Sequence, residues 1–156
     1  MISQDILDLA RARGVMIATA ESCTGGMVAV ALTDIPGSSS VVERGFVTYS
    51  NNAKIEMLGV SPETLATQGA VSEEVAREMA EGALRHSHAH LAVSITGIAG
   101  PGGSEHKPEG RVCFGLARTA HPTGTVTRDF GAQGRVRVRD LSRDHALSML
   151  RTALAQ

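Results

Sequence analysis

The sequence predicts a single α/β domain over residues 1–156, built as a three-layer α/β/α sandwich with a mixed sheet. Two observations lead to this prediction. Short apolar and β-branched runs alternate with segments of helical periodicity along most of the chain. Nearer the C-terminus, the runs RVCFGLA and TVTRDFG are separated by the turn residues HPTG, which is typical of an antiparallel strand pair.

The first half of the chain is predicted to hold two strands, each followed by a turn and a helix. A first helix begins near Ser3, which can cap it, and ends at Gly14. The run VMIATA (15–20) predicts a buried strand, after which ESCTGG turns into a helix through MVAVALTD. GFVTYS (45–50) predicts the second strand, and NNAKIEML a short helix that Gly59 ends.

The second half is predicted to hold two capped helices, the remaining strands and a long C-terminal helix. Ser61 caps a short helix, and Ser72 caps a helix through Leu84 whose two early acids suit the helix dipole. LAVSITG (91–97) predicts the third strand, which a glycine-rich loop follows. The last helix runs from about residue 135 to residue 154. Ligands of such folds bind at strand ends, so the catalytic loops are expected there.

Composition excludes several classes of partner. The net charge of −1 gives no overall field that would attract nucleic acid or an anionic membrane, and aromatic residues are only 3%. The longest apolar runs fall short of the roughly 20 residues of a membrane span. Cys23 and Cys113 fit no disulfide framework or metal-ligand spacing, and the N-terminus does not resemble a signal peptide. We expect a cytoplasmic protein that contacts neither nucleic acid nor membrane.

The segment AESCTGG (20–26) places small polar side chains between a strand and two glycines that open a helix. Backbone N–H groups at such a start favour an anion, and the glycines allow a ligand to approach closely. We therefore expect Ser22, Thr24 and Gly25 to bind substrate; the alternative is that Ser22 or Thr24 only caps the helix. Cys23 could be a nucleophile with a lowered pKa, or a small buried hydrophobe.

The segment PGSSS (36–40) offers more hydroxyl groups than one helix cap needs. A serine nucleophile requires a base, and a desolvated, neutral lysine can serve. Lys54 lies in the helix after the next strand and is a candidate base, and Tyr49 could hydrogen-bond to either partner. A turn serine and a surface lysine are the alternative reading of the same residues.

A long loop follows the third strand, in SITGIAGPGGSEHKPEGRV (94–112). Such a loop can present backbone N–H groups to a phosphate or an oxyanion, so we expect Thr96, Gly97 and Gly100 to contact substrate. The spacing of its glycines matches neither a P-loop nor a dinucleotide-binding fingerprint. The alternative is a surface loop without a ligand.

Three arginines open the last helix, where the helix dipole disfavours cations. Arg135 and Arg139 share a face by their spacing, and a bound phosphate would compensate both. The alternative partners are Asp140 and Asp144. The histidines of HSHAH (86–90) have no carboxylate or cysteine beside them, so no metal site is expected.

Together these segments resemble the CinA C-terminal domain family, and most closely its stand-alone bacterial members, which are nicotinamide mononucleotide deamidases. The motifs that carry the resemblance stand in the family's order, and they are AESCTGG, ERGFVTYSNNAK, GAVSEEVA, SITGIAGPGG and KPEGRV. The resemblance covers nearly all of residues 1–154. Before the last helix the family often has GDR, whereas this chain has AQGR, which keeps the arginine and lacks the aspartate.

The resemblance implies hydrolysis of the carboxamide of nicotinamide mononucleotide to nicotinate mononucleotide and ammonia, by a homodimer that needs no metal or organic cofactor. Carried over by position, the family's catalytic serine is Ser39 and its lysine is Lys54, with Tyr49 assisting. The neutral lysine would take the proton of the serine that attacks the carboxamide carbon.

The resemblance also implies that Ser22 and Thr96 line the site and that Arg135 binds the phosphate, with Arg139 as the alternative. Ser22 is the rival nucleophile because it too lies at a helix start beside glycines. Two other functions stay open at this point. One is a non-catalytic nucleotide-binding or regulatory domain, and the other is an amidohydrolase that uses Cys23.

Overall fold

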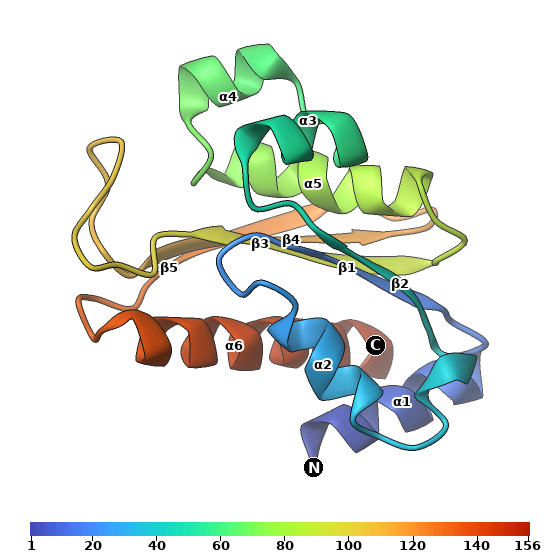
Figure 1. Cartoon of the computed structure of the whole chain (residues 1–156). Helices are drawn as coiled ribbons and strands as arrows, with labels where there is room; N and C mark the ends of the chain where they lie inside the picture. Colours follow the sequence, from blue (N-terminus) through green and yellow to red (C-terminus); the bar gives the residue numbers. More distant parts are fainter.

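The structure, a computed structural model, describes residues 1–156 and confirms the three-layer α/β sandwich with a mixed sheet (Figure 1). Five strands form one sheet in the order β2-β1-β3-β4-β5. The strands are β1 (Ile17–Glu21), β2 (Val42–Val47), β3 (Leu91–Gly97), β4 (Arg111–Arg118) and β5 (Gly124–Asp129).

Strand direction brings several chain segments to one edge of the sheet. β1 is parallel to both of its neighbours, β2 and β3, whereas β4 is antiparallel to β3 and to β5. The carboxyl ends of β1, β2 and β3 therefore share an edge with the beginning of β4, where Gly97 pairs with Val112. We call this the carboxyl edge of the sheet.

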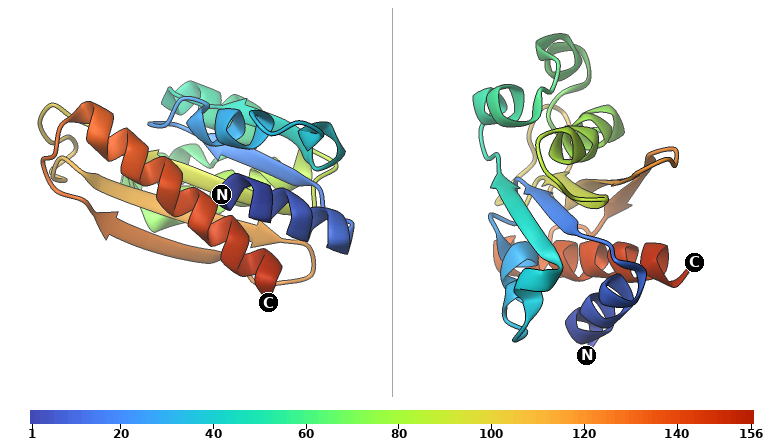
Figure 2. Two further views of the ribbon diagram at one scale, coloured as in Figure 1. Left: turned by 90° about the horizontal axis from the view of Figure 1, so that it is seen from below. Right: turned by 90° about the vertical axis from the view of Figure 1, so that its right-hand side faces the viewer.

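Two helical layers cover the sheet, as the two views of Figure 2 also show. One layer holds α1 (Ile2–Arg13), α2 (Met27–Thr33) and α6 (Arg135–Ala155). The other holds α3 (Asn51–Leu58), α4 (Pro62–Gln68) and α5 (Glu73–Arg85). The main apolar core lies between the sheet and α1, α2 and α6, and a smaller one lies beneath α3 and α5. No helix combines the length and the apolar character that crossing a bilayer requires.

Several predicted helix ends are confirmed. The hydroxyls of Ser61 and Ser72 accept hydrogen bonds from the first turns of α4 and α5. Gly14 and Gly59 end α1 and α3 in the left-handed conformation that glycine adopts readily. The expectation for Ser3 was wrong, because α1 already begins at Ile2 and Ser3 is buried inside it without capping it.

The second strand was predicted too late in the chain. β2 begins at Val42 rather than at residue 45, and it ends at Val47 rather than at residue 50. Its first residues include Glu43 and Arg44, which form an ion pair with each other. Charged residues are tolerated there because β2 is an edge strand, half exposed along its length.

The helix that carries Lys54 is held against α5 by a glycine. Gly82 lies in the middle of α5, and a Cβ at this position would overlap the carbonyl oxygen of Leu58 in α3. Glycine therefore allows the two backbones to approach closely and fixes α3 above the sheet.

Candidate functional site

A pocket of about 310 Å³ lies at the carboxyl edge of the sheet. Its walls come from the segments after β1, β2 and β3, from the connection between α4 and α5, and from the start of α6. Of the expected site residues it contains Ser22, Tyr49, Lys54, Thr96, Gly97, Gly100 and Arg135. Ser39, Thr24, Gly25 and Arg139 do not line it.

Lys54 is the most buried charged group of the pocket, with 1% of its surface exposed. Its Nζ lies 3.0 Å from the Oγ of Ser22. It also donates to the backbone carbonyl oxygens of Thr48, at 2.9 Å, and of Tyr49, at 3.3 Å. The end of β2 and the first turn of α3 thus fold around one amino group and direct it at one serine.

Burial lowers the pKa of Lys54 from 10.5 to about 8, although the carboxylate of Glu105 acts in the opposite direction. A charged amine loses hydration when it is buried, and the neutral form is favoured as a result. A pKa near 8 leaves about a tenth of the molecules with a neutral amine at pH 7, against roughly one in three thousand for an ordinary lysine. Lys54 is therefore suited to accept a proton near neutral pH.

The three partners of Lys54 suit both forms of the amine. The ammonium donates to all three oxygens, those of Ser22, Thr48 and Tyr49, and the neutral amine can keep the same contacts. A neutral amine has two N–H groups and one lone pair. The carbonyls of Thr48 and Tyr49 can only accept, so they take the two N–H groups. The lone pair then remains for Ser22, whose hydroxyl can donate to it. This arrangement places a serine hydroxyl in hydrogen-bonding contact with an amine that, when neutral, can accept its proton.

A buried carboxylate fixes the turn and the helix start that follow Ser22. Glu21, the last residue of β1, is 1% exposed and accepts from the Thr24 hydroxyl at 2.6 Å. It also accepts from the backbone N–H groups of Val28 and Ala29, at 2.9 and 3.1 Å, which cap α2. Glu21 was not predicted from the sequence. Thr24 was expected to bind substrate, whereas its hydroxyl donates to the Glu21 carboxylate. The available signal for Glu21 was an acid between a predicted buried strand and the helix that follows it.

The structure corrects the expected position of Ser39. Ser38–Ser40 form a short 3-10 helix that precedes β2, whereas Lys54 follows β2. Ser39 therefore lies at the opposite edge of the sheet, about 20 Å away by the length of the strand. Ser39 is exposed, and the neighbouring Ser40 accepts a hydrogen bond from Arg11. The serine that faces Lys54 is Ser22.

Cys23 adjoins Ser22 and lines the pocket, but its thiol is poorly suited to attack. It is 4% exposed, and burial raises its pKa to about 12. The thiol is thus protonated at neutral pH, and the thiolate is the reactive form. Of the two alternatives for Cys23, this geometry favours the small buried hydrophobe.

Arg135 and Arg139 have different environments. Arg135 is exposed at the pocket, where it donates to the carbonyl oxygen of Gly100 and to the Tyr49 hydroxyl, both at 2.7 Å. Arg139 lies one turn further and donates to the carbonyl oxygens of Cys23 and Thr24, at 3.0 and 3.3 Å. Arg139 therefore fixes the turn that carries Ser22, and Arg135 is the cation available to a ligand.

The loop between β3 and β4, drawn in gold in Figure 1, supplies backbone N–H groups to the pocket. The N–H groups of Ala99, Gly100, Gly103 and Cys23 donate to no backbone carbonyl of the chain. Free donors that line a pocket can bind an oxyanion or a phosphate. The hydroxyl of Thr96 instead donates to the carbonyl oxygen of Ala70 at 2.8 Å, so it joins two parts of the pocket wall to each other.

The tip of this loop is fastened to the connection between α4 and α5. The ammonium of Lys107 donates to the carbonyl oxygens of Gln68, at 2.7 Å, and Val71. The carboxylate of Glu105 accepts from the N–H of Ala70 at 3.2 Å. The chain has only two lysines, Lys54 and Lys107, and both lie at this site. Apart from the histidines, every other basic residue is arginine. That contrast was the signal for Lys107, which sequence analysis missed.

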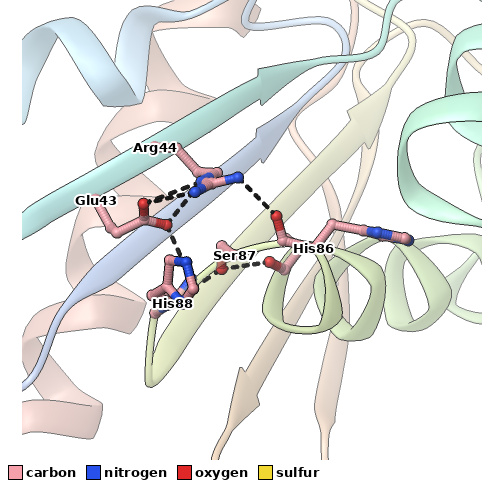
Figure 3. Close-up of polar contacts among 7 residues, drawn as sticks. Glu43, Arg44, His86, Ser87 and His88 are labelled. Atoms are coloured by element: carbon pink, nitrogen blue, oxygen red, sulfur yellow. Dashed lines mark hydrogen bonds and ion pairs between the residues drawn. The ribbon is translucent and has the colours of Figure 1, made fainter.

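The histidine-rich segment lies away from the pocket, near the beginnings of β2 and β3 (Figure 3). Arg44 pairs with Glu43 and donates to the carbonyl oxygen of His86, at 3.0 Å. Glu43 also accepts from the backbone N–H of His88. The segment thus forms the expected polar connection between α5 and β3. No three histidine, cysteine or acidic side chains in the protein are arranged to hold a metal ion.

Comparison with known proteins agrees with this architecture. The family model of the CinA C-terminal domain matches residues 1–154. The chain belongs to this family. It is 53% identical over 150 residues to the nicotinamide-nucleotide amidohydrolase PncC of Escherichia coli K12, covering 96% of this chain and 90% of that protein. A CinA-like protein of Chloroherpeton thalassium is 58% identical over 120 residues, 76% of this chain and 29% of its own length.

The chain therefore spans under a third of the length of the CinA-like relatives and nearly all of the amidohydrolase. Among solved structures, the competence/damage inducible protein CihA of Agrobacterium tumefaciens superposes with a TM-score of 0.89 at 50% sequence identity. That similarity covers 97% of this chain and 96% of the other.

Proposed function

We propose that the protein is a nicotinamide-nucleotide amidohydrolase that converts nicotinamide mononucleotide to nicotinate mononucleotide and ammonia. The observation that carries the proposal is the contact between Ser22 and a buried Lys54 with a lowered pKa. The similarity to a full-length relative named for this activity supports the choice of substrate. In this mechanism Ser22 takes the catalytic role that position alone assigned to Ser39.

The reaction begins with attack by the Ser22 oxygen on the carboxamide carbon, while the neutral amine of Lys54 takes the hydroxyl proton. The negative charge on the carboxamide oxygen is stabilised by unpaired N–H groups such as those of Cys23 and Ala99. Lys54 then gives its proton to the leaving nitrogen, and ammonia departs from an acyl-enzyme. A water molecule, deprotonated by Lys54, hydrolyses this ester and restores Ser22.

Arg135 binds the phosphate of the nucleotide in this proposal. Its guanidinium already orients the Tyr49 hydroxyl, and the free N–H groups of Gly100 and Gly103 border the same pocket. Tyr49 therefore acts at the phosphate end through its side chain, and on Lys54 through its carbonyl oxygen. No step requires a metal or an organic cofactor.

We also propose that the enzyme is a cytoplasmic homodimer. Two free, buried cysteines are typical of proteins in a reducing compartment. The edge strand β2 ends in an apolar side chain, Val47, that is 49% exposed and could be covered by a second copy. Sedimentation measures the assembly directly, and a monomer at all concentrations would contradict the dimer.

The experiment measures ammonia released from nicotinamide mononucleotide by the wild type and by two serine variants. Ser22→Ala is expected to reduce kcat by at least roughly 10³-fold because it removes the nucleophile. Ser39→Ala is the matched control at the opposite edge of the sheet and is expected to retain wild-type activity. Mass spectrometry of enzyme quenched during turnover should find the acyl group on Ser22.

Two results would overturn the proposal in different ways. An acyl group on Ser39 or Cys23 would reassign the nucleophile and leave the reaction in place. No ammonia from the wild type, together with tight binding of the nucleotide, would favour the non-catalytic nucleotide-binding domain.

A further inference from the structure

The pocket has one acidic side chain, which the proposed reaction does not use. Three charged residues line it, namely Lys54, Arg135 and Glu105. Lys54 serves the serine and Arg135 is placed for a phosphate. Glu105 lies at the tip of the loop between β3 and β4, and it has no ion-pair partner in the protein.

One hydrogen bond, and the space left by a glycine, place the Glu105 carboxylate on the pocket wall. Its Oε2 accepts from the N–H of Ala70, which also lines the pocket, while its Oε1 has no partner within the chain. Gly69 makes room for it, because a Cβ at that position would overlap Oε2. The nearby Lys107 forms no ion pair with the carboxylate, and its ammonium donates to the carbonyl oxygens of Gln68 and Val71 instead.

The substrate of the proposed reaction has a matching charge. The ring nitrogen of nicotinamide mononucleotide bears the ribose and is therefore a permanent cation. Its carboxamide belongs at Ser22 and its phosphate at Arg135, so the cationic ring lies between the two. A fixed negative charge on the wall attracts such a ring and distinguishes it from an uncharged one.

We propose that Glu105 is a specificity-determining residue that selects a cationic pyridinium ring. The inference rests on the proposed function, because the ring is placed by the carboxamide and phosphate contacts. Glu105 acts on binding by charge and takes part in no bond that forms or breaks. It therefore determines which carboxamides reach Ser22 and leaves the chemistry at Ser22 to Lys54.

The test compares two ligands and two glutamate variants. The ligands are nicotinamide mononucleotide and its C-nucleotide analogue, in which the ribose is joined to a ring carbon and the pyridine is neutral. Dissociation constants are measured by calorimetry in the Ser22→Ala background, where turnover is stopped. Glu105→Gln removes the charge and retains an oxygen that can accept from Ala70. Glu63→Gln, on the exposed first turn of α4, removes the same charge away from the pocket.

Glu105→Gln should weaken binding of the cationic nucleotide about fivefold, the upper range for a solvent-exposed charge pair, and leave the neutral analogue within about twofold. Glu63→Gln should change neither. Equal losses of affinity for both ligands, or no loss for the cationic nucleotide, would overturn the role of Glu105. The proposed function would still be supported if the wild type released ammonia. Absence of both binding and ammonia release would overturn the two together.

Discussion

The buried amine of Lys54 should make the free energy of unfolding depend on pH, and the substitution Lys54→Met should remove this dependence. Lys54 is 1% exposed and its pKa falls from 10.5 to about 8 on folding. That change corresponds to about 3 kcal/mol, at roughly 1.36 kcal/mol per pH unit. The folded protein bears this cost at neutral pH, where the lysine is protonated in both the folded and the unfolded state.

The sign follows from counting protons. Between about pH 8 and pH 10 the unfolded chain keeps the proton of Lys54, while the folded protein loses it. The unfolded state then binds more protons, so the free energy of unfolding rises with pH over this interval. The expected gain is about 2 kcal/mol from pH 8 to pH 10, the part of the total that lies within this window.

Lys54→Met removes the titrating group and keeps an unbranched side chain of similar size. The assay is urea unfolding of the wild type and the variant at several pH values from 7 to 10. The difference between the two curves cancels the other titrating groups, and it should move by about 2 kcal/mol in favour of the wild type.

Arg137→Met, which removes an exposed cation, provides the control and should show no such movement. Parallel curves for the wild type and Lys54→Met would refute the lowered pKa. They would also remove the physical basis for Lys54 as a neutral base.

Two further predictions concern the phosphate and the packing of α3. Arg135→Ala should weaken the transition-state complex of the mononucleotide by roughly 1.5–3 kcal/mol, and this loss should appear mainly as a higher KM. The KM for nicotinamide riboside, which lacks the phosphate, should change little. Equal effects on both substrates would contradict a phosphate contact. Gly82→Ala should lower the free energy of unfolding by about 1–3 kcal/mol in urea titrations, because its Cβ would overlap the Leu58 carbonyl. Gly124→Ala, where a Cβ would meet nothing within 4 Å, should be nearly neutral, and equal losses would refute the packing argument.

The sequence by itself determined the architecture and singled out the lysine that the structure buries at the pocket. Periodicity located the buried strand at 91–97 at its observed bounds, and the hydroxyls of Ser61 and Ser72 marked two helix starts. These features are local, because caps and periodicity depend on residues a few positions apart. Lys54 was also found from the sequence, because a lysine is conspicuous where nearly every other cation is an arginine.

The sequence also contained an unused indication against Ser39. A residue before a strand and a residue after it lie at opposite edges of the sheet, and PGSSS precedes β2 while Lys54 follows it. The exact start of β2 was harder to predict. Glu43 and Arg44 resemble loop residues until it is known that β2 is an edge strand.

Only the tertiary structure decided which serine meets Lys54 and which arginine faces the pocket. β1 pairs in parallel with both β2 and β3, so the segments after all three strands converge at one edge and bring Ser22 within 3.0 Å of Lys54. Arg135 and Arg139 share a helix face, yet only Arg139 is engaged by the carbonyls of the Ser22 turn. The lowered pKa of Lys54 likewise comes from burial by segments distant in the chain. Proximity and desolvation depend on strand order and packing, which no local pattern of residues specifies.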